Sequence, residues 1–505
     1  MIRAIRNARP LGGHEPIDLL IDDGVIVGIL PAGLGGAELR GDELVEGEID
    51  LEGRHVMPAL WDEHVHMTQW AQHRRRIDLG GAESAAEAAA IVRSAIGSGE
   101  ARDAVVVGVG FRDALWPDAP TAALLDQVSS DRPIVLISAD VHCVWVNSAA
   151  LVHFGVDGDS AEAHEGVLRE DAAFALTSRL DSTTDDELDQ WVADAAAEAA
   201  RRGVVGIVDL EMRWNRDDWA RRVARGFDAL RVEFGVYPQH LDQAIALGLR
   251  SGTPVAGTVA VGPLKVITDG SLNTRTAYCC DPYPDAPAEP YGRLNVPPCD
   301  LHPLLARASE AGFDLAVHAI GDGANKLALD VFAKLGRGGR IEHAQLVHES
   351  DFGRFAALGV TASVQPEHAM DDRDVAEHYW SGRTGRAFAL RSLLDAGARI
   401  VLGSDAPVAP LDPWQAIAAA TSRSRDARPA FHPEQAITIT EALTASTRTL
   451  VGLGEPADLI ALDVDPLAAD GDTLRRMPVA LTMLGGRVTH HDRALSAGAL
   501  ATVGV

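Results

Sequence analysis

The stretch ALWDEHVHM, residues 59–67, places His64 and His66 one residue apart at the end of an apolar run. Successive side chains of a β-strand point to opposite faces, so these two imidazoles would lie on the same side of a strand. Imidazole is a preferred ligand of zinc and related metals. The stretch therefore indicates either half of a metal site at a strand end or an incidental pair in a loop, and other segments must supply the remaining ligands.

Length and composition limit the class of protein. The 505 residues suffice for one large domain with additions, or for two to three ordinary domains. Hydrophobic residues make up 47% and charged residues 23%, as in soluble globular proteins. The net charge of −28 argues against nucleic acid and membrane partners and leaves a small-molecule substrate. Because the first residues lack an apolar signal segment, we expect a cytoplasmic protein.

The middle of the chain alternates short apolar runs with amphipathic stretches, which is typical of a parallel sheet built from β–α units. Eight strands are predicted on this basis, at residues 59–67, 204–211, 230–237, 262–270, 313–322, 339–346, 359–366 and 398–407. Eight is the strand number of a (β/α)8 barrel. We therefore predict an α/β fold whose TIM-like barrel spans residues 57–71 and 189–450.

Two parts of the chain fall outside this alternation. Residues 1–56 and 451–505 read as short strands separated by turns, and we expect them to meet in one composite β-sandwich. Residues 72–188 carry helices and strands of their own. We expect them to form an α/β insertion after the first barrel strand that covers the active site.

Six potential metal ligands stand near the carboxyl ends of five predicted strands. They are His64, His66, Lys265, His318, His343 and Asp405. Each of these residues, taken alone, could also be a structural residue of the core or of a turn. In a barrel, however, all these strand ends converge on one face. Their common placement predicts one metal centre there. His348 and His368 have no strand-end placement and are not assigned to it.

Lys265 is one of only three lysines among 45 basic residues, and it lies within an apolar strand. Burial lowers the pKa of an amine, and a neutral lysine amine reacts with carbon dioxide to give an anionic carbamate. A carbamate bridges two metals, and two metals hold a bridging hydroxide and polarise a carbonyl. Asp405 would bind one metal and carry a proton from the hydroxide to a leaving nitrogen.

The chain resembles the amidohydrolase superfamily, and within it the YtcJ-like branch (amidohydrolase family 3), which includes N-substituted formamide deformylases. The resemblance runs almost the full length. It rests on VMPALWDEHVHM, DRPIVLISADVHCVWVNSAAL, LKVITDGSLNTRTAYCCDPYPD, AVHAIGDGAN, RIEHAQL, GSDAPVAPLDPW and EPADLIALDVDP. It implies a metal-dependent hydrolase in which the six residues match the family's ligand positions and Lys265 is the carboxylated lysine between two metals.

Further candidates are placed near the predicted mouth of the barrel. We assign substrate contacts to His142, Asn147, Trp116, Asp269, Arg275 and Asp322, with roles inside the fold as the alternative for each. Glu170 and Asp322 are also candidates to orient groups near the metals. Cys279 and Cys280 depart from the family pattern, since apolar or small residues are expected near the mouth. Ala59 and Trp61 depart from it in the first strand motif.

Three functions remain open on the sequence. The first is hydrolysis of an amide, formamide or cyclic amide C–N bond with two zinc ions, for which iron, manganese or cobalt are alternatives. The second is a deaminase with one metal, and the third is a catalytically silent assembly protein, against which the full ligand set argues. No Walker, GxGxxG or GxSxG motif supports nucleotide binding or a serine nucleophile. The oligomeric state stays open, with a homodimer as the candidate.

Overall fold

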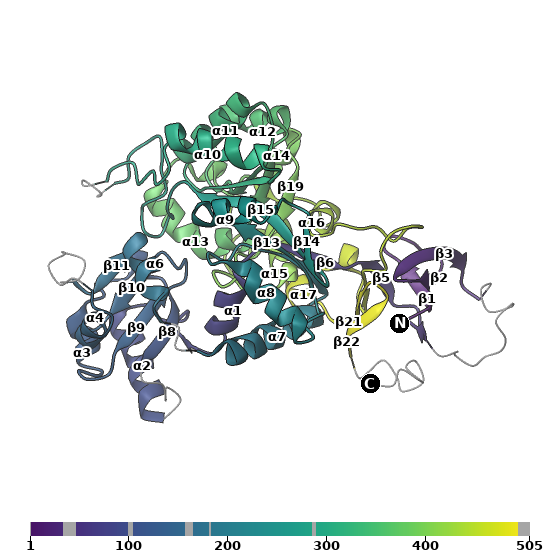
Figure 1. The fold of residues 1–505 in the computed structure, drawn as a ribbon, viewed down its shortest axis with the longest axis horizontal. Coiled ribbons are helices and arrows are strands. Elements are labelled where there is room, and N and C mark those ends of the chain that lie inside the picture. Colours follow the sequence, from purple (N-terminus) through teal and green to yellow (C-terminus); the bar gives the residue numbers. More distant parts are fainter. Residues whose placement is uncertain are drawn as a thin grey trace.

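The computed structural model describes residues 2–33, 47–98, 105–156, 165–180, 183–284 and 289–492. These residues form a central barrel with an insertion on one side and a sheet from both ends of the chain on the other (Figure 1). Residues 34–46 and 493–505 of the predicted sandwich, and residues 99–104 and 157–164 of the predicted insertion, lie outside the described residues. No helix among the described residues is both long and apolar enough to span a membrane.

The barrel contains all eight predicted strands in parallel register. They are β6 (Leu60–Val65), β12 (Val204–Asp209), β13 (Arg231–Val236), β15 (Val259–Ile267), β16 (Leu315–Ala319), β17 (Arg340–His343), β18 (Thr361–Val364) and β19 (Ile400–Leu402). The short β14 (Pro254–Ala256) lies antiparallel beside β15. A parallel bridge between Val65 and Ala406 brings the last strand back to the first. The predicted barrel is therefore confirmed.

These segments form strands because nearly every one of their side chains is buried. In β6, β12 and β16 every residue is buried, as expected for parallel strands that have a core on one face and helices on the other. One hydrophobic cluster runs through the barrel and its helices and includes Leu60, Ile207, Val317 and Ile341. This rigid scaffold fixes the direction of each strand end.

Helices surround the barrel on its outside. They are α1 (Met67–His73), α7 (Asp185–Arg201), α8 (Asn215–Ala224), α9 (Leu241–Ala246), α10 (Pro298–Glu310), α11 (Asp322–Leu335), α12 (Phe352–Leu358), α13 (Pro366–Tyr379), α14 (Leu390–Asp395), α15 (Pro413–Ser422), α16 (Ile439–Ala445) and α17 (Gly471–Arg475). The helix α7 begins at a capping box, in which Thr184 and Glu187 satisfy each other's backbone N–H groups. Its Val192, Ala195 and Ala199 are buried in the hydrophobic cluster of the barrel.

The two ends of the chain form one composite sheet. Its strands are β1 (Ala4–Pro10), β2 (Ile17–Asp22), β3 (Val25–Pro31), β4 (Glu48–Asp50), β5 (His55–Pro58), β20 (Leu459–Leu462), β21 (Val479–Leu484) and β22 (Arg487–His491). The strands β5 and β20 pair antiparallel, which joins the two ends. Side chains from both ends, among them Ile5, Leu19, Leu459 and Leu481, share one buried core.

The insertion follows α1 and has its own five-stranded sheet. Its strands are β7 (Ile77–Asp78), β8 (Val106–Phe111), β9 (Ile134–Ser138), β10 (Cys143–Val146) and β11 (Val167–Arg169). Its helices are α2 (Ala85–Ser98), α3 (Ala122–Asp126), α4 (Ser148–His153) and α6 (Asp171–Thr177). The loop between β9 and β10, together with α6, faces the barrel mouth.

Trp61, an unusual residue in the first strand motif, has a specific partner in the barrel. A Cβ atom at Gly206 on the neighbouring strand β12 would lie 2.2 Å from the Trp61 ring. The guanidinium of Arg448 lies 3.8 Å from the centre of the same ring. The indole therefore fills space that glycine leaves open and forms a cation–π contact.

Candidate metal centre

The carboxyl ends of the barrel strands enclose a pocket of about 60 Å³. Its wall contains all six residues that the sequence predicts for the metal site: His64, His66, Lys265, His318, His343 and Asp405. None of them is more than 9% exposed. Because parallel strands direct their carboxyl ends to one face of a barrel, residues far apart in the sequence meet here.

His64 and His66 approach the same carboxylate oxygen. Nε2 of each imidazole lies 3.3 Å from Oδ1 of Asp405. The backbone N–H of Asp405 donates to the carbonyl of His64 at 2.7 Å, and Asp405 has a left-handed φ of 59°. Such a backbone is unfavourable for a residue with a Cβ atom, so barrel closure holds the carboxylate in place against a local preference.

His318 and His343 complete the ring of imidazoles. The centre of the His343 ring lies 4.5 Å from that of His318 and 5.0 Å from that of His64. Burial lowers the pKa of His318 and His343 well below the usual value. Both imidazoles are therefore neutral and keep a lone pair for a metal.

Lys265 lies in β15 with its side chain inside the barrel. It is 1% exposed, and its Nζ lies 3.4 Å from Nε2 of His64. Burial lowers the pKa of the amine to about 8, although Glu342 and Asp405 act to raise it. No carboxylate of the described residues lies within ion-pair distance of Nζ, so a sizeable fraction of the amine is neutral near pH 8.

The donor atoms fit divalent metal ions. Two groups have ligand atoms within 4.8 Å of one another: His64, His66 and Asp405, and His343, His368 and Asp405. Buried ring nitrogens of His66, His343 and His368 have no hydrogen-bond partner among the described residues. An unpaired buried nitrogen is costly unless it binds something, and nitrogen with carboxylate oxygen suits zinc, iron, manganese and cobalt.

His368 is the site residue that the sequence interpretation misses. Its ring stacks on His343 with centres 6.0 Å apart, and its Nε2 lies 3.7 Å from Oδ2 of Asp405. It stands in the first turn of α13, which begins two residues after β18 ends at Val364. The sequence feature that could have revealed His368 is Pro366. Proline favours the first position of a helix, so it marks a helix that starts at the mouth.

Glu342 is a second residue that the sequence does not single out. His343 has a φ of 74°, so the strand alternation ends there, and adjacent residues both reach the barrel interior. Oε2 of Glu342 lies 2.8 Å from Nδ1 of His64. Burial would raise the pKa of Glu342, but Arg340 and His64 lower it, so the group is a carboxylate. It holds the proton of His64 on Nδ1 and leaves Nε2 free towards the pocket.

The Glu342 carboxylate belongs to a buried charge network that continues away from the pocket. Arg340 donates from Nε to Oε1 of Glu342 at 2.7 Å and from Nη1 to Oε2 of Glu63 at 3.1 Å. Glu63 in turn accepts from Nε of Arg448 at 2.6 Å. Each charge has a partner, which is the condition under which buried charges are tolerated.

The insertion contributes an ion pair to the pocket wall. Nδ1 of His142 lies 2.9 Å from Oε2 of Glu170, and the second oxygen of Glu170 accepts from the hydroxyl of Thr276. Burial would lower the pKa of His142, but Glu170 raises it to about 9. Burial would raise the pKa of Glu170, but His142 and the hydroxyls lower it to about 2. His142 is therefore an imidazolium, and its Nε2 remains as a second donor.

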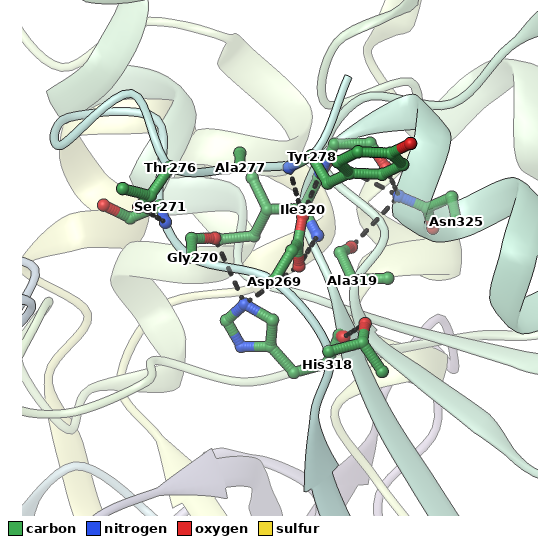
Figure 2. Close-up of polar contacts among 12 residues, drawn as sticks. Asp269, Gly270, Ser271, Thr276, Ala277, Tyr278, His318, Ala319, Ile320 and Asn325 are labelled. Carbon is green, nitrogen blue, oxygen red and sulfur yellow. Dashed lines mark hydrogen bonds and ion pairs between the residues drawn. The ribbon is translucent and has the colours of Figure 1, made fainter. Parts of the chain in front are cut away.

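Asp269, predicted as a substrate contact, instead fastens two loops. Figure 2 shows its carboxylate beside the backbone N–H groups of Tyr278 and Ile320, which donate at 2.9 and 3.1 Å. The backbone N–H of Gly321 also donates to it, at 2.9 Å. One of its oxygens also lies 3.4 Å from Nε2 of His318. Asp269 does not line the pocket. It fixes the connection after β15 to the residues that follow His318.

Four other predicted contacts have partners outside the pocket. Asn147 caps α4 and donates to the carbonyls of Ser129 and Arg132. Asp322 is fully buried and accepts from the backbone of Cys280 and from Arg386. Trp116 and Arg275 line a separate cavity of about 370 Å³ and not the metal pocket. Of the six predicted substrate contacts, the pocket wall includes His142 alone.

The two adjacent cysteines also do not line the pocket. Cys279 is buried, with its Sγ 3.5 Å from the hydroxyl of Tyr283, and burial raises the pKa of its thiol to about 12. Cys280 is exposed. Cys279 packs in an apolar cluster beside the pocket, which shares Leu272 and Ile320 with the pocket wall.

A (β/α)8 barrel with histidines, a lysine and an aspartate at its strand ends defines a class, the metal-dependent barrel enzymes. The model of the amidohydrolase family matches residues 47–490, and the chain belongs to this family. It is accordingly a metal-dependent hydrolase of the amidohydrolase type.

Relatives of known sequence or structure agree with this assignment. The chain is 26% identical to the putative amidohydrolase YtcJ of Bacillus subtilis, over 95% of this chain and 96% of that one. It is 25% identical to the N-substituted formamide deformylase of Arthrobacter pascens, over 90% and 92%. An uncharacterised metal-dependent hydrolase from Pyrococcus horikoshii has a TM-score of 0.77 and 25% identity, over 93% of this chain and 99% of that one.

Proposed function

We propose that the protein hydrolyses the C–N bond of an amide, formamide or cyclic amide. Two divalent metal ions would be held by His64, His66, His318, His343, Asp405 and a carboxylated Lys265. Zinc is the favoured metal. The observation that carries this proposal is the place of Lys265. Its buried amine, with a lowered pKa, lies 3.4 Å from Nε2 of His64, in a pocket wall that also holds His66, His318 and His343.

When bound, such metals act as Lewis acids towards a carbonyl and lower the pKa of water. The chain's own residues then have separate tasks. Burial would raise the pKa of Asp405, but its imidazole neighbours lower it well below the usual value, so the group is a carboxylate, the ionised form from which a proton shuttle starts. It would take a proton from the attacking water and deliver it to the nitrogen as the C–N bond breaks, which gives an acid and an amine.

His142 is proposed to bind the carbonyl oxygen of the substrate. The imidazolium is held by Glu170 and lies across the pocket from His318, with ring centres 6.1 Å apart. A fixed donor aimed at an oxygen that gains negative charge stabilises the transition state more than the ground state. His368, beside Asp405, would keep that carboxylate oriented or bind the second metal ion.

Metal content tests the proposal most directly. We expect about two metal ions per chain in the purified protein, and a carbamate carbon resonance in a sample prepared with ¹³C-bicarbonate. The Lys265→Ala variant should lose the resonance and at least one metal. Lys326→Ala, at an exposed lysine paired with Asp330, is the matched control and should keep both. One metal in the wild type, with no carbamate, would favour the single-metal deaminase.

The reaction is tested with N-formyl, N-acyl and cyclic amide compounds, assayed for release of acid and amine. Aminated heterocycles, assayed for release of ammonia, serve the deaminase alternative. Turnover of the amides supports the proposal. Turnover of the heterocycles alone contradicts it.

A further inference from the structure

A further cavity, larger than the metal pocket and here named the lobe cleft, lies between the insertion and the barrel. Its volume is about 410 Å³, against about 60 Å³ for the metal pocket. One wall is formed by α1 and the segments after β12 and β19, and the other by the ends of β8 and β9 and by α6. Figure 1 shows α1 between the insertion and the barrel.

The lobe cleft adjoins the metal pocket. Four residues line both: Gln69 and Met212 from the barrel, and Val141 and Phe174 from the insertion. The metal pocket has room for a scissile group and little more, since a single water already needs ~10–15 Å³ on this scale. A substrate bound there therefore has the lobe cleft as adjoining space for its remaining atoms.

The apolar part of the cleft lining is substantial. Val109, Ile137, Val141, Phe174, Met212 and Pro407 contribute to it. Val141, Phe174 and Met212 are partly exposed, so they still present apolar surface to the cleft. Such a surface gains by covering itself with an apolar group.

The charged groups of the lobe cleft are already engaged. Glu211 accepts from the backbone and side chain of Gln69 and from the backbone of Met212. Arg213 pairs with Asp218 at 3.0 Å, and Arg76 also has an interaction within the described residues. Burial lowers the pKa of His73 to about 4, so its ring is neutral at physiological pH. The cleft therefore has no unpaired cation among the described residues for an anionic substituent, and its one carboxylate, Glu211, already accepts three hydrogen bonds.

We infer that the lobe cleft is the binding site for an uncharged, largely apolar substituent on the substrate's scissile group. The substrate class is then a neutral amide or formamide with an extended apolar arm, and not a free amino acid derivative. The identity of the cleaved group rests on the proposed function. The nature of the arm rests on the lobe cleft alone.

A homologous series of N-alkylformamides, from methyl to hexyl, measures the contribution of the arm. Burial of a methylene predicts a rise in kcat/KM of roughly fourfold for each added carbon until the cleft is full. An arm of the same length that ends in a carboxylate or an ammonium group should lose this gain. A flat dependence on chain length, or equal gains for charged arms, would overturn the inference.

Substitutions at the carboxyl end of α6 locate the effect. Thr177→Trp and Ser178→Trp place an indole in the lobe cleft, because both residues line it. They should remove the chain-length dependence and leave the methyl compound unchanged. Ala175→Trp is the matched control, since Ala175 is exposed on the same helix and does not line the cleft. Persistence of the chain-length gain in both cleft variants contradicts the assignment, provided that their thermal midpoints equal that of the control.

Binding without turnover separates this inference from the proposed function. N-hexylacetamide and N-methylacetamide are titrated into metal-free protein and followed by ligand-observed NMR. The hexyl compound should bind at least tenfold more tightly to the wild type and to Ala175→Trp, but not to Thr177→Trp. This result supports the cleft even if no formamide is hydrolysed. Equal binding of the two compounds refutes the cleft even if hydrolysis is found.

Discussion

Single residues at the candidate metal centre adopt conformations that local preference disfavours. His343 and Asp405 both have positive φ values, 74° and 59°, and each lies at the end of a barrel strand. Strain of this kind persists where the surrounding structure dictates it, and it concentrates at functional sites. Here it turns an imidazole and a carboxylate into the pocket from positions where a regular strand would direct them elsewhere.

His368 gives the first prediction at this scale. The variant His368→Ala should weaken metal binding about 10–100-fold, because the imidazole contacts the carboxylate of Asp405 and belongs to a ligand group. Competition with a chromophoric chelator measures the affinity. The control is His348→Ala, at a histidine whose side chain is 50% exposed. Equal affinities in the two variants would exclude a role for His368 in the metal centre.

The pair of His142 and Glu170 predicts a pH dependence of stability. The pKa of His142 is raised to about 9 in the folded protein, so the pair stabilises fully below about pH 6.5 and less as the pH rises through 9. The loss is at most about 3 kcal/mol. Scanning fluorimetry between pH 6.5 and 9.5 should show a fall in thermal midpoint that His142→Gln reduces. A variant with the same pH profile as the wild type would contradict this.

At the scale of elements, the connection after β15 links the barrel to the insertion. Ser271 donates to Asp140, and Thr274 and Thr276 donate to Glu170. A Cβ atom at Gly270 would lie 2.0 Å from Oγ1 of Thr276, so the close approach of these segments requires glycine there. The loop therefore fixes His142, through Glu170, relative to β15, the strand that holds Lys265.

Asp269→Asn tests this connection. The amide offers one acceptor oxygen where the carboxylate offers two, and three backbone N–H groups depend on them. We expect a loss of about 1–3 kcal/mol in stability together with faster loss of metal to a chelator. Asp281→Asn, at an exposed position of the same connection, is the control. Unchanged metal retention would show that the loop does not support His318.

At the scale of the whole molecule, the metal ions should link the strand ends into one stable unit. A ligand that binds only the folded state adds about 4 kcal/mol at a thousandfold excess over its Kd. Removal of metal by a chelator should therefore lower the thermal midpoint and abolish hydrolysis, and added zinc should restore both. If stability were unchanged while activity was lost, the ions would contribute to chemistry alone.

The sequence predicts the eight barrel strands because each is buried on both faces and appears as a continuous apolar run. It also identifies the residues at the strand ends, since alternation along a strand is a local property. His368 and Glu342 are not found in this way. One lies on a helix, and the other depends on the positive φ of His343, which reflects barrel closure rather than a pattern in the chain.

The sequence by itself determined the barrel and pointed to the six residues that line one pocket at its strand ends, because burial and alternation are encoded locally. Only the tertiary structure decided which of the remaining polar residues face the pocket. Asn147 and Asp269 are used inside the fold, whereas His142 reaches the pocket wall. The reason is physical: a polar side chain is committed by the partners within 3–4 Å of it, and those partners come from distant segments that meet only on folding.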